Sequence, residues 1–146
     1  MRLAVLDTNV IVSAAINDEG TPARIVMEWV LDEDVQTVLC TAVEREYMAV
    51  IAREKFSRYG FPPFWLGRLL GLSMRLPDPA PWPLALPESK DAPFLALAHA
   101  AGAWLVRGNL KHFPKSARNG VTVLSPADYL AHLTGEGSLP QAGYSY

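Results

Sequence analysis

Polar side chains follow two apolar runs of this chain, at the points where chemistry is usually found in parallel-sheet proteins. Asp7 and Asn9 come directly after the run at residues 3–6, and Asn109 follows the run at residues 103–107. Such runs predict strands that are buried on both faces, and the carboxyl ends of parallel strands meet at one edge of a sheet. We therefore expect these polar side chains to share one crevice.

Two further acids fall near the starts of predicted helices that begin on the same edge. Glu46 lies early in a helix that starts at residue 41, and Asp91 precedes a helix over residues 92–101. Two carboxylates about 4 Å apart repel by about 4 kcal/mol at an effective dielectric of about 20, so three together need protons or a cation. All-oxygen sites suit Mg²⁺ or Mn²⁺. Asp7, Glu46 and Asp91 are therefore the predicted metal ligands, which favours metal-assisted hydrolysis of a phosphodiester.

Each acid also has a structural alternative. Asp7 and Asp91 stand where a side chain could do no more than cap the following helix. Thr41 and Glu44 fit a capping box, which would explain Glu44 without any chemistry. Glu46 has no capping role and lies beside the buried stripe of its helix, where a carboxylate needs a reason. Glu46 rather than Glu44 is therefore the predicted functional acid.

Length and composition fit one domain that folds without covalent cross-links. The chain has 146 residues, 50% of them hydrophobic, and its single cysteine, Cys40, excludes an internal disulfide. A net charge of −2 argues against a protein that coats long nucleic acids, although a local basic patch suffices for an enzyme acting on a short piece of RNA. No run approaches the roughly 18 apolar residues of a membrane span. We expect a cytoplasmic protein that does not contact the membrane.

Helix and strand patterns alternate along the chain, which favours parallel βαβ units and an α/β fold. The expected strands are residues 3–6, 36–39, 103–107 and 121–124, and the expected helices are 10–16, 21–32, 41–55, 64–72, 92–101 and 126–133. Phe64 and Trp65 of the fourth helix are expected in the core. Five prolines over residues 76–87 exclude a long helix or a central strand there. We predict one domain over residues 1–134, followed by a flexible tail over residues 135–146.

Four short motifs occur in series between residue 3 and about residue 130. They are Leu-Asp-Thr-Asn-Val at 6–10, Glu-Tyr at 46–47 with Arg-Glu-Lys-Phe at 53–56, Asp-Ala-Pro-Phe-Leu-Ala-Leu-Ala at 91–98, and Leu-Val-Arg-Gly-Asn-Leu-Lys-His-Phe-Pro at 105–114. In this order and spacing the chain resembles the PIN-domain family, in particular its branch of VapC-like toxin components of toxin–antitoxin systems. One motif alone would be a weak signal, whereas four in series are a strong one.

The resemblance implies a PIN-like, three-layer α/β/α sandwich with a central parallel sheet. It also implies an Mg²⁺- or Mn²⁺-dependent endoribonuclease, the toxin of a toxin–antitoxin pair, whose partners are the RNA substrate, a cognate antitoxin and a second copy in a homodimer. Asp7, Glu46 and Asp91 match the family's first three acids. Asn109 stands where members carry a fourth aspartate or an asparagine, which makes it a candidate catalytic residue. Asn9 matches the polar residue after the first acid and is expected to contact substrate.

Arg107 is the motif position that departs from the family pattern, in which Ser or Thr usually precedes Gly108. Its guanidinium could extend outward to an RNA phosphate or fold inward to pair with the acids and compete with the metal. We predict the outward orientation and a role in substrate binding, because the long stem lets the head leave a crowded site.

Two other functions remain open from the sequence. One is a catalytically weakened PIN-like module that binds RNA or a protein, with Arg107 in place of the metal. The other is a phosphoryl-transfer enzyme with Asp7 as its nucleophile, although Thr8 and Asn9 supply no second acid or lysine behind it.

Overall fold

The strands of this protein form one parallel sheet whose order reverses at its centre. A computed structural model describes residues 2–135, so all of the tail predicted over residues 135–146 except Gly135 lies outside the described residues. The strands are β1 (Arg2–Leu6), β2 (Val35–Leu39), β3 (Met74–Arg75), β4 (Trp104–Val106) and β5 (Val123–Leu124). They pair in the order β3-β2-β1-β4-β5, all parallel. The order reverses between β1 and β4, and ligands of open α/β sheets bind at such a switch point.

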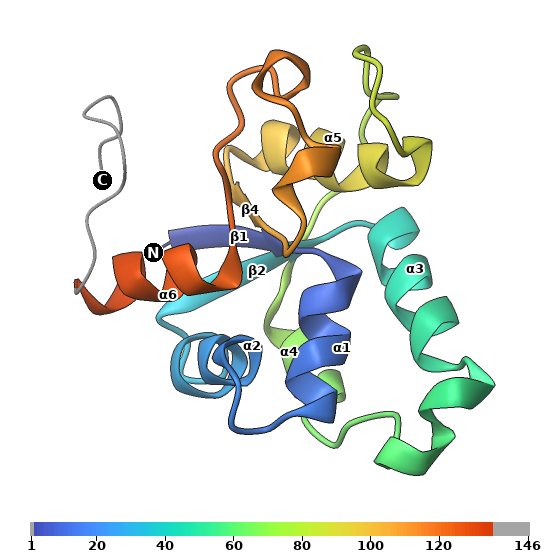
Figure 1. The fold of residues 1–146 in the computed structure, drawn as a ribbon, viewed down its shortest axis with the longest axis vertical. Helices are drawn as coiled ribbons and strands as arrows, with labels where there is room; N and C mark the ends of the chain where they lie inside the picture. Colours follow the sequence, from blue (N-terminus) through green and yellow to red (C-terminus); the bar gives the residue numbers. More distant parts are fainter. Residues whose placement is uncertain (1, 136–146) are drawn as a thin grey trace.

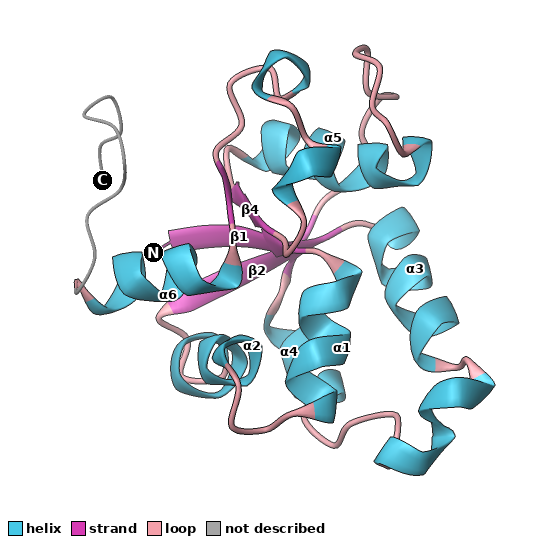
Figure 2. Cartoon of the chain, in the orientation of Figure 1, coloured by secondary structure: helices cyan, strands magenta, loops and turns pink. Residues whose placement is uncertain are grey.

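Helices cover both faces of the sheet. They are α1 (Thr8–Ile16), α2 (Thr21–Arg24) continuing into the π-helix η1 (Ile25–Val30), α3 (Thr41–Ile51), α4 (Leu66–Leu72), α5 (Ala92–Ala101) and α6 (Pro126–Thr134). Short 3₁₀ turns complete the chain at η2 (Glu54–Tyr59), η3 (Ser89–Asp91), η4 (Leu110–His112) and η5 (Lys115–Ala117). The helix α5 lies on one side of the sheet against β1, β2 and β4, while α1, α2 and α6 lie on the other (Figures 1 and 2). This is the predicted α/β/α sandwich.

The core is built around β1 and α5. Val5 of β1 and both Leu95 and Leu97 of α5 are fully buried, so these two elements are apolar on nearly all sides. As predicted, α5 ends at Gly102, whose φ of +64° is left-handed and suits a residue without a Cβ. Within residues 2–135 no helix has the length and apolarity needed to cross a bilayer.

The start of α3 is stabilised differently from the prediction. Thr41 is the first helical residue rather than the N-cap. Asp78, from the proline-rich connection, accepts a hydrogen bond from the Ala42 amide at 3.0 Å, and Glu44 forms an ion pair with Arg75 at the end of β3. The predicted capping box is therefore wrong, because a segment distant in sequence satisfies the helix end.

Two predicted helices are shorter in the structure. α3 ends at Ile51, and Arg53 is extended, with φ −63° and ψ 137°, before the 3₁₀ turn η2 begins. α4 begins only at Leu66, so Phe64 lies in the preceding turn and is 92% exposed, against the expectation that it lies in the core. Trp65 is buried as predicted.

Candidate active site

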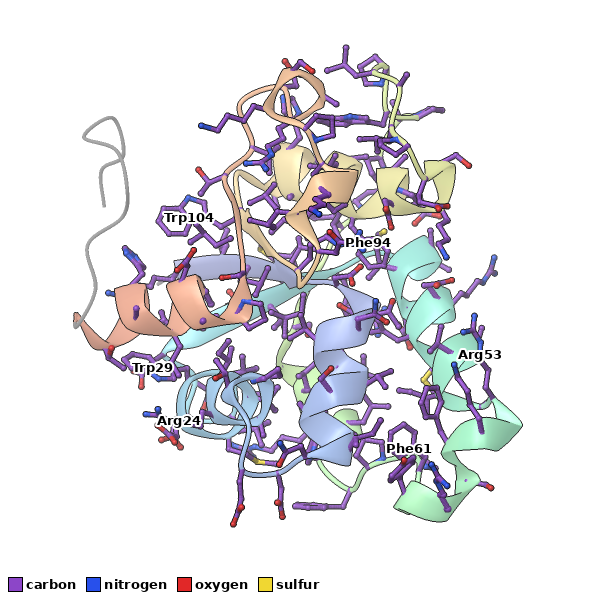
Figure 3. All side chains as sticks on the ribbon, viewed as in Figure 1. Arg24, Trp29, Arg53, Phe61, Phe94 and Trp104 are labelled. Atoms are coloured by element: carbon purple, nitrogen blue, oxygen red, sulfur yellow. The ribbon has the colours of Figure 1, made fainter. Side chains whose placement is uncertain are left out.

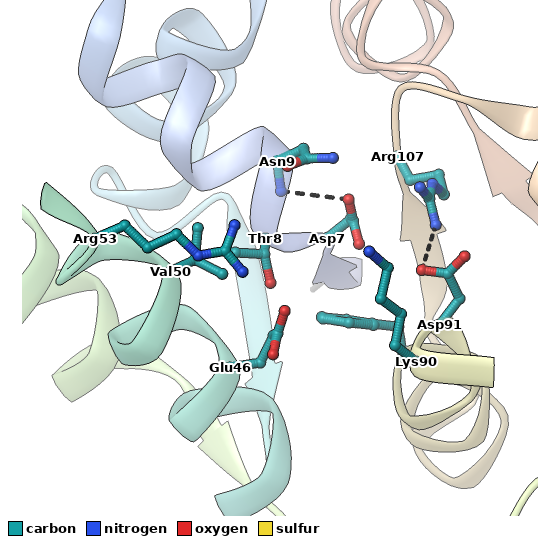
Figure 4. A pocket seen from close by; sticks show the side chains of 10 residues that line it. Asp7, Thr8, Asn9, Glu46, Val50, Arg53, Lys90, Asp91 and Arg107 are labelled. Carbon is teal, nitrogen blue, oxygen red and sulfur yellow. Dashed lines mark hydrogen bonds and ion pairs between the residues drawn. The ribbon is translucent and has the colours of Figure 1, made fainter. Parts of the chain in front are cut away.

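A pocket of about 140 Å³ opens at the carboxyl end of the sheet, beside the switch point between β1 and β4 (Figure 4). Its lining includes Asp7, Asn9, Glu46, Asp91 and Arg107. We call it the acid pocket. These residues come from the ends of β1 and β4, from α3 and from the turn before α5, so the pocket gathers four parts of the chain that the sequence places far apart.

Asp7 is held where β1 becomes α1. Its backbone amide donates to the Val106 carbonyl of β4 at 3.0 Å, which continues the sheet by one residue. Its side chain accepts a hydrogen bond from the Asn9 amide at 3.3 Å and caps α1 (Figure 4). Asp7 therefore does cap the helix, as one reading of the sequence expected, and it also lines the acid pocket.

The environment of the Asp7 carboxyl disfavours its ionised form. Asp7 is only 4% exposed, and burial raises its pKa above the ordinary value, with the neighbouring Asp91 acting in the same direction. Arg107 and the Asn9 amide act in the opposite direction, and the net shift of the Asp7 pKa is upward. A cation added to the pocket would therefore favour the ionised form of Asp7.

Glu46 is brought to the pocket by its neighbour in sequence. The hydroxyl of Tyr47, fully buried against the sheet, donates to the Leu6 carbonyl at the end of β1. This contact holds the middle of α3 beside the end of β1, and the adjacent Glu46 is half-buried on the pocket wall. Glu44 is not among the residues that line the acid pocket, and it forms an ion pair with Arg75 at the end of β3.

Asp91 and Arg107 form an ion pair inside the pocket. Nη1 of Arg107 lies 2.9 Å from Oδ1 of Asp91 (Figure 4). The guanidinium also lies over the Phe113 ring, 4.6 Å from its centroid. Arg107 is 4% exposed, so the predicted outward orientation is wrong. The Arg107 amide is held by the Leu124 carbonyl of β5, and the acids supply the charge that a buried guanidinium needs. Asp91 itself makes no capping hydrogen bond to α5.

Asn109 is not among the residues that line the acid pocket. It is exposed, and its Oδ1 accepts a hydrogen bond from the Lys111 amide at 3.1 Å, which caps the turn η4. Asn109 follows Arg107 by two residues at the carboxyl end of β4. Its catalytic role stays a prediction.

The acids share a pocket without forming a ready-made metal cage. Among residues 2–135 no group of three or more His, Cys, Asp or Glu side chains is arranged to hold a metal ion. The donor types nonetheless fit a hard divalent cation, because Asp7, Glu46 and Asp91 supply carboxylate oxygens. The Thr8 hydroxyl is buried in the same pocket and makes no hydrogen bond within the described part of the chain, which adds a fourth oxygen. Arg107 is the group that a cation would have to displace from Asp91.

Three polar pocket residues were not predicted as site residues from the sequence: Thr8, Arg53 and Lys90. Arg53 could have been found from the helix predicted over residues 41–55. Val50 follows Glu46 by four positions and Arg53 follows Val50 by three, a spacing that puts all three on one helix face. Lys90 adjoins Asp91 in sequence and lies in an exposed turn, where a lysine carries no signal of its own.

Comparison with known families and structures agrees with this geometry. A family model described as "PIN domain" matches residues 3–111. Comparison with curated proteins finds no match.

Two solved structures share the fold. VapBC2 from Rickettsia felis, bound to a DNA fragment from their promoter, superposes with a TM-score of 0.61 at 17% identity, covering 84% of this chain and 98% of that chain. FitAcB from Neisseria gonorrhoeae superposes with a TM-score of 0.57 at 17% identity, covering 85% and 98%. At this identity the likeness concerns the fold alone.

Proposed function

This chain belongs to the PIN domain family, and from that premise we propose that it is a metal-dependent endoribonuclease whose active site is the acid pocket. PIN domains are typically nucleases, which supports a hydrolase acting on nucleic acid. The observation that carries the proposal is the gathering of Asp7, Glu46 and Asp91 around one opening at the switch point of the sheet. Three acids at one pocket repel one another, and a divalent cation relieves that repulsion.

Asp7, Glu46 and Asp91 would hold Mg²⁺ or Mn²⁺, which when bound polarises a phosphodiester and lowers the pKa of water. Other residues of the chain orient these ligands and attract the substrate. The Asn9 amide fixes the Asp7 carboxylate through its 3.3 Å hydrogen bond. Lys90 and Arg53 line the same pocket, where two cations attract the phosphates of a nucleic acid strand. Asn9 is proposed to contact the substrate at the pocket mouth, because its side chain is exposed there.

We further propose that the chain is the toxin of a toxin–antitoxin pair and acts in the cytoplasm. The support is the similar fold of the toxin components in VapBC2 and FitAcB, which are complexes of a toxin with its antitoxin. A cognate antitoxin is the expected partner, and a homodimer the expected assembly. A search of the flanking DNA for a small reading frame, followed by co-expression and co-purification of its product with this chain, tests the antitoxin.

A second candidate function is a catalytically weakened module that binds RNA or a protein. The observation that favours it is the buried ion pair between Arg107 and Asp91, since an internal cation then neutralises the site without metal. The two functions differ in their response to metal, because the binding module would neither bind Mn²⁺ nor cleave RNA.

The two neighbouring glutamates provide a matched test of the proposed nuclease. Purified protein should cut single-stranded RNA with Mg²⁺ or Mn²⁺ and stop when a chelator is added. Glu46→Gln should abolish most of this activity without a large change in melting temperature, because Glu46 lines the pocket. Glu44→Gln is the control: it breaks only a partly exposed ion pair with Arg75, so it should cost less than about 1 kcal/mol of stability and leave cleavage intact. Loss of cleavage in Glu44→Gln alone would reverse this assignment.

A further inference from the structure

A second hollow adjoins the acid pocket at the end of α3. It has a volume of about 220 Å³, and its lining includes Met48, Ile51, Arg53, Ser57 and Phe61. We call it the α3 groove. Met48 is 42% exposed, so the wall of the groove presents apolar surface to solvent. Figure 3 shows Arg53 and Phe61 on the same side of the molecule, near the carboxyl end of α3.

Aromatic rings and cations are interspersed over residues 53–61, the segment that contributes Arg53, Ser57 and Phe61 to the groove. Phe61 stacks on Phe56, with 5.3 Å between ring centroids and 20° between planes. The Lys55 ammonium lies 5.1 Å from the Phe56 centroid, and the Arg58 guanidinium lies 4.9 Å from the ring of Tyr59. Residues 53–58 carry three cations against one carboxylate in a chain whose net charge is −2. The positive charge is therefore concentrated next to exposed aromatic surface.

Arg53 lines both the α3 groove and the acid pocket, so the two hollows adjoin at this residue. Proteins that bind single-stranded nucleic acid combine cations that follow the backbone with aromatic rings on which the bases stack. A volume of about 220 Å³ is below the roughly 300 Å³ at which pockets begin to take drug-sized ligands, which suits a single ring system. An acidic peptide would match the cations but not the stacked rings.

Building on the proposed nuclease activity, we propose that the α3 groove binds a nucleobase of single-stranded RNA, that of a nucleotide flanking the phosphate in the acid pocket. Arg53 contacts the phosphate between the two hollows. The base lies against Phe61 and the Met48 side chain, while Lys55 and Arg58 attract the backbone that leaves the site. The groove thereby selects single strands, because a base paired in a duplex cannot enter it.

The test is RNA binding without cleavage, measured by fluorescence anisotropy in chelator. The probes are a labelled single-stranded RNA octamer and an octamer of the same length made of abasic nucleotides. Wild type should bind the RNA about tenfold more tightly than the abasic strand, which reflects stacking of a base. Phe61→Leu keeps apolar volume but loses the ring face, and it should remove this preference. Phe64→Leu removes an equally aromatic, 92% exposed side chain that does not line the groove, and it should keep the preference.

A second variant, which fills the groove with a larger side chain, keeps the test decisive if Phe61→Leu fails to fold. Ser57 is exposed, so Ser57→Trp should fill the groove without unfolding the protein and should also remove the preference. An equal affinity of wild type for both strands would overturn the proposal, as would Ser57→Trp changing the oligomeric state while RNA affinity is unchanged. Because no metal is present, these outcomes are separate from the nuclease: RNA that binds through the groove but is not cut with Mn²⁺ would contradict only the activity.

Discussion

Arg107 compensates part of the negative charge of the acid pocket without a metal ion. Its guanidinium pairs with Asp91 at 2.9 Å and lowers the pKa of Asp7, so one buried cation compensates two buried carboxylates. Removing one partner of such a buried pair typically costs about 3 to 5 kcal/mol, because the remaining charge is left without compensation. A divalent cation and Arg107 therefore act on the same acids.

Arg107→Thr should separate these two sources of positive charge. In chelator the variant should lose about 3 kcal/mol of unfolding free energy. Added Mn²⁺ should restore much of it, and the Mn²⁺-induced rise in melting temperature should exceed that of wild type, because tighter binding to the folded state stabilises it more. RNA cleavage should increase at low Mn²⁺.

Lys90→Thr is the matched control for this experiment. It removes one cation from the same pocket, but an exposed one. Its melting temperature in chelator and its response to Mn²⁺ should stay close to those of wild type. An Arg107→Thr variant that binds Mn²⁺ no more tightly than wild type would contradict competition between Arg107 and the metal.

At the scale of elements, α3 depends on a cap that comes from the proline-rich connection. Asp78 accepts a hydrogen bond from the Ala42 amide at 3.0 Å, and this bond is the main reason why the pKa of Asp78 is lowered. A carboxyl whose pKa is lowered by folding stabilises the protein above its unfolded pKa and loses that effect as pH falls through the folded pKa. Asp78 at the start of α3 and Tyr47 in its middle both hold the helix that carries Glu46.

Asp78→Ala should therefore lower the melting temperature at pH 7, and the difference from wild type should disappear in acid, below pH 4. Asp78→Asn keeps an oxygen acceptor for the Ala42 amide, so it should lie between wild type and Asp78→Ala. Thermal unfolding followed by circular dichroism measures both. A difference that persists unchanged into acid would show that the contribution is not that of an ionised cap.

The sequence predicted the elements better than their ends. The buried runs fixed β1, β2, β4 and β5, and the alternation with helices predicted a parallel sheet, because strand burial and helix periodicity are local properties. The start of α3 was misassigned because Asp78, more than thirty residues away, supplies the cap in place of Thr41 and Glu44. Phe64 was misplaced because two prolines delay the start of α4 to Leu66.

The sequence predicted which acids line the pocket, but it did not predict how their charges are compensated. Asp7, Glu46 and Asp91 could be placed at one sheet edge, since strand ends and helix starts determine that edge. The inward orientation of Arg107 depends on its contacts with buried carboxylates and with the Phe113 ring. No spacing of residues in the sequence predicts these contacts.

At the scale of the whole molecule, the two ends of the sheet differ in what they carry. The acid pocket occupies the carboxyl end, whereas α6 packs near the amino end of β4, where the rings of His132 and Trp104 are 4.7 Å apart. Burial lowers the pKa of His132, and the nearby Arg2 adds to this. The unfolded chain therefore takes up a proton at a higher pH than the folded one, so stability is lost as pH falls through the ordinary value of 6.5.

His132→Phe should remove part of this pH dependence. Wild type should lose melting temperature between about pH 7.5 and pH 5.5, and the variant should lose less over the same range. The raised pKa of Asp7 contributes a dependence of opposite sign, but it is common to both proteins and cancels in the comparison. His99→Gln, at an exposed histidine of α5, serves as the control and should behave like wild type.

The central claim is that the acid pocket holds a divalent cation that RNA cleavage requires, and Asp7→Asn tests it most directly. The change removes one anionic oxygen ligand and keeps the shape and the acceptor for the Asn9 amide. Because burial disfavours the Asp7 charge, the melting temperature in chelator should be maintained or raised. Measured over a Mn²⁺ titration, RNA cleavage by Asp7→Asn should fall by about 100-fold or more relative to wild type. Full, metal-dependent cleavage by Asp7→Asn would contradict the account.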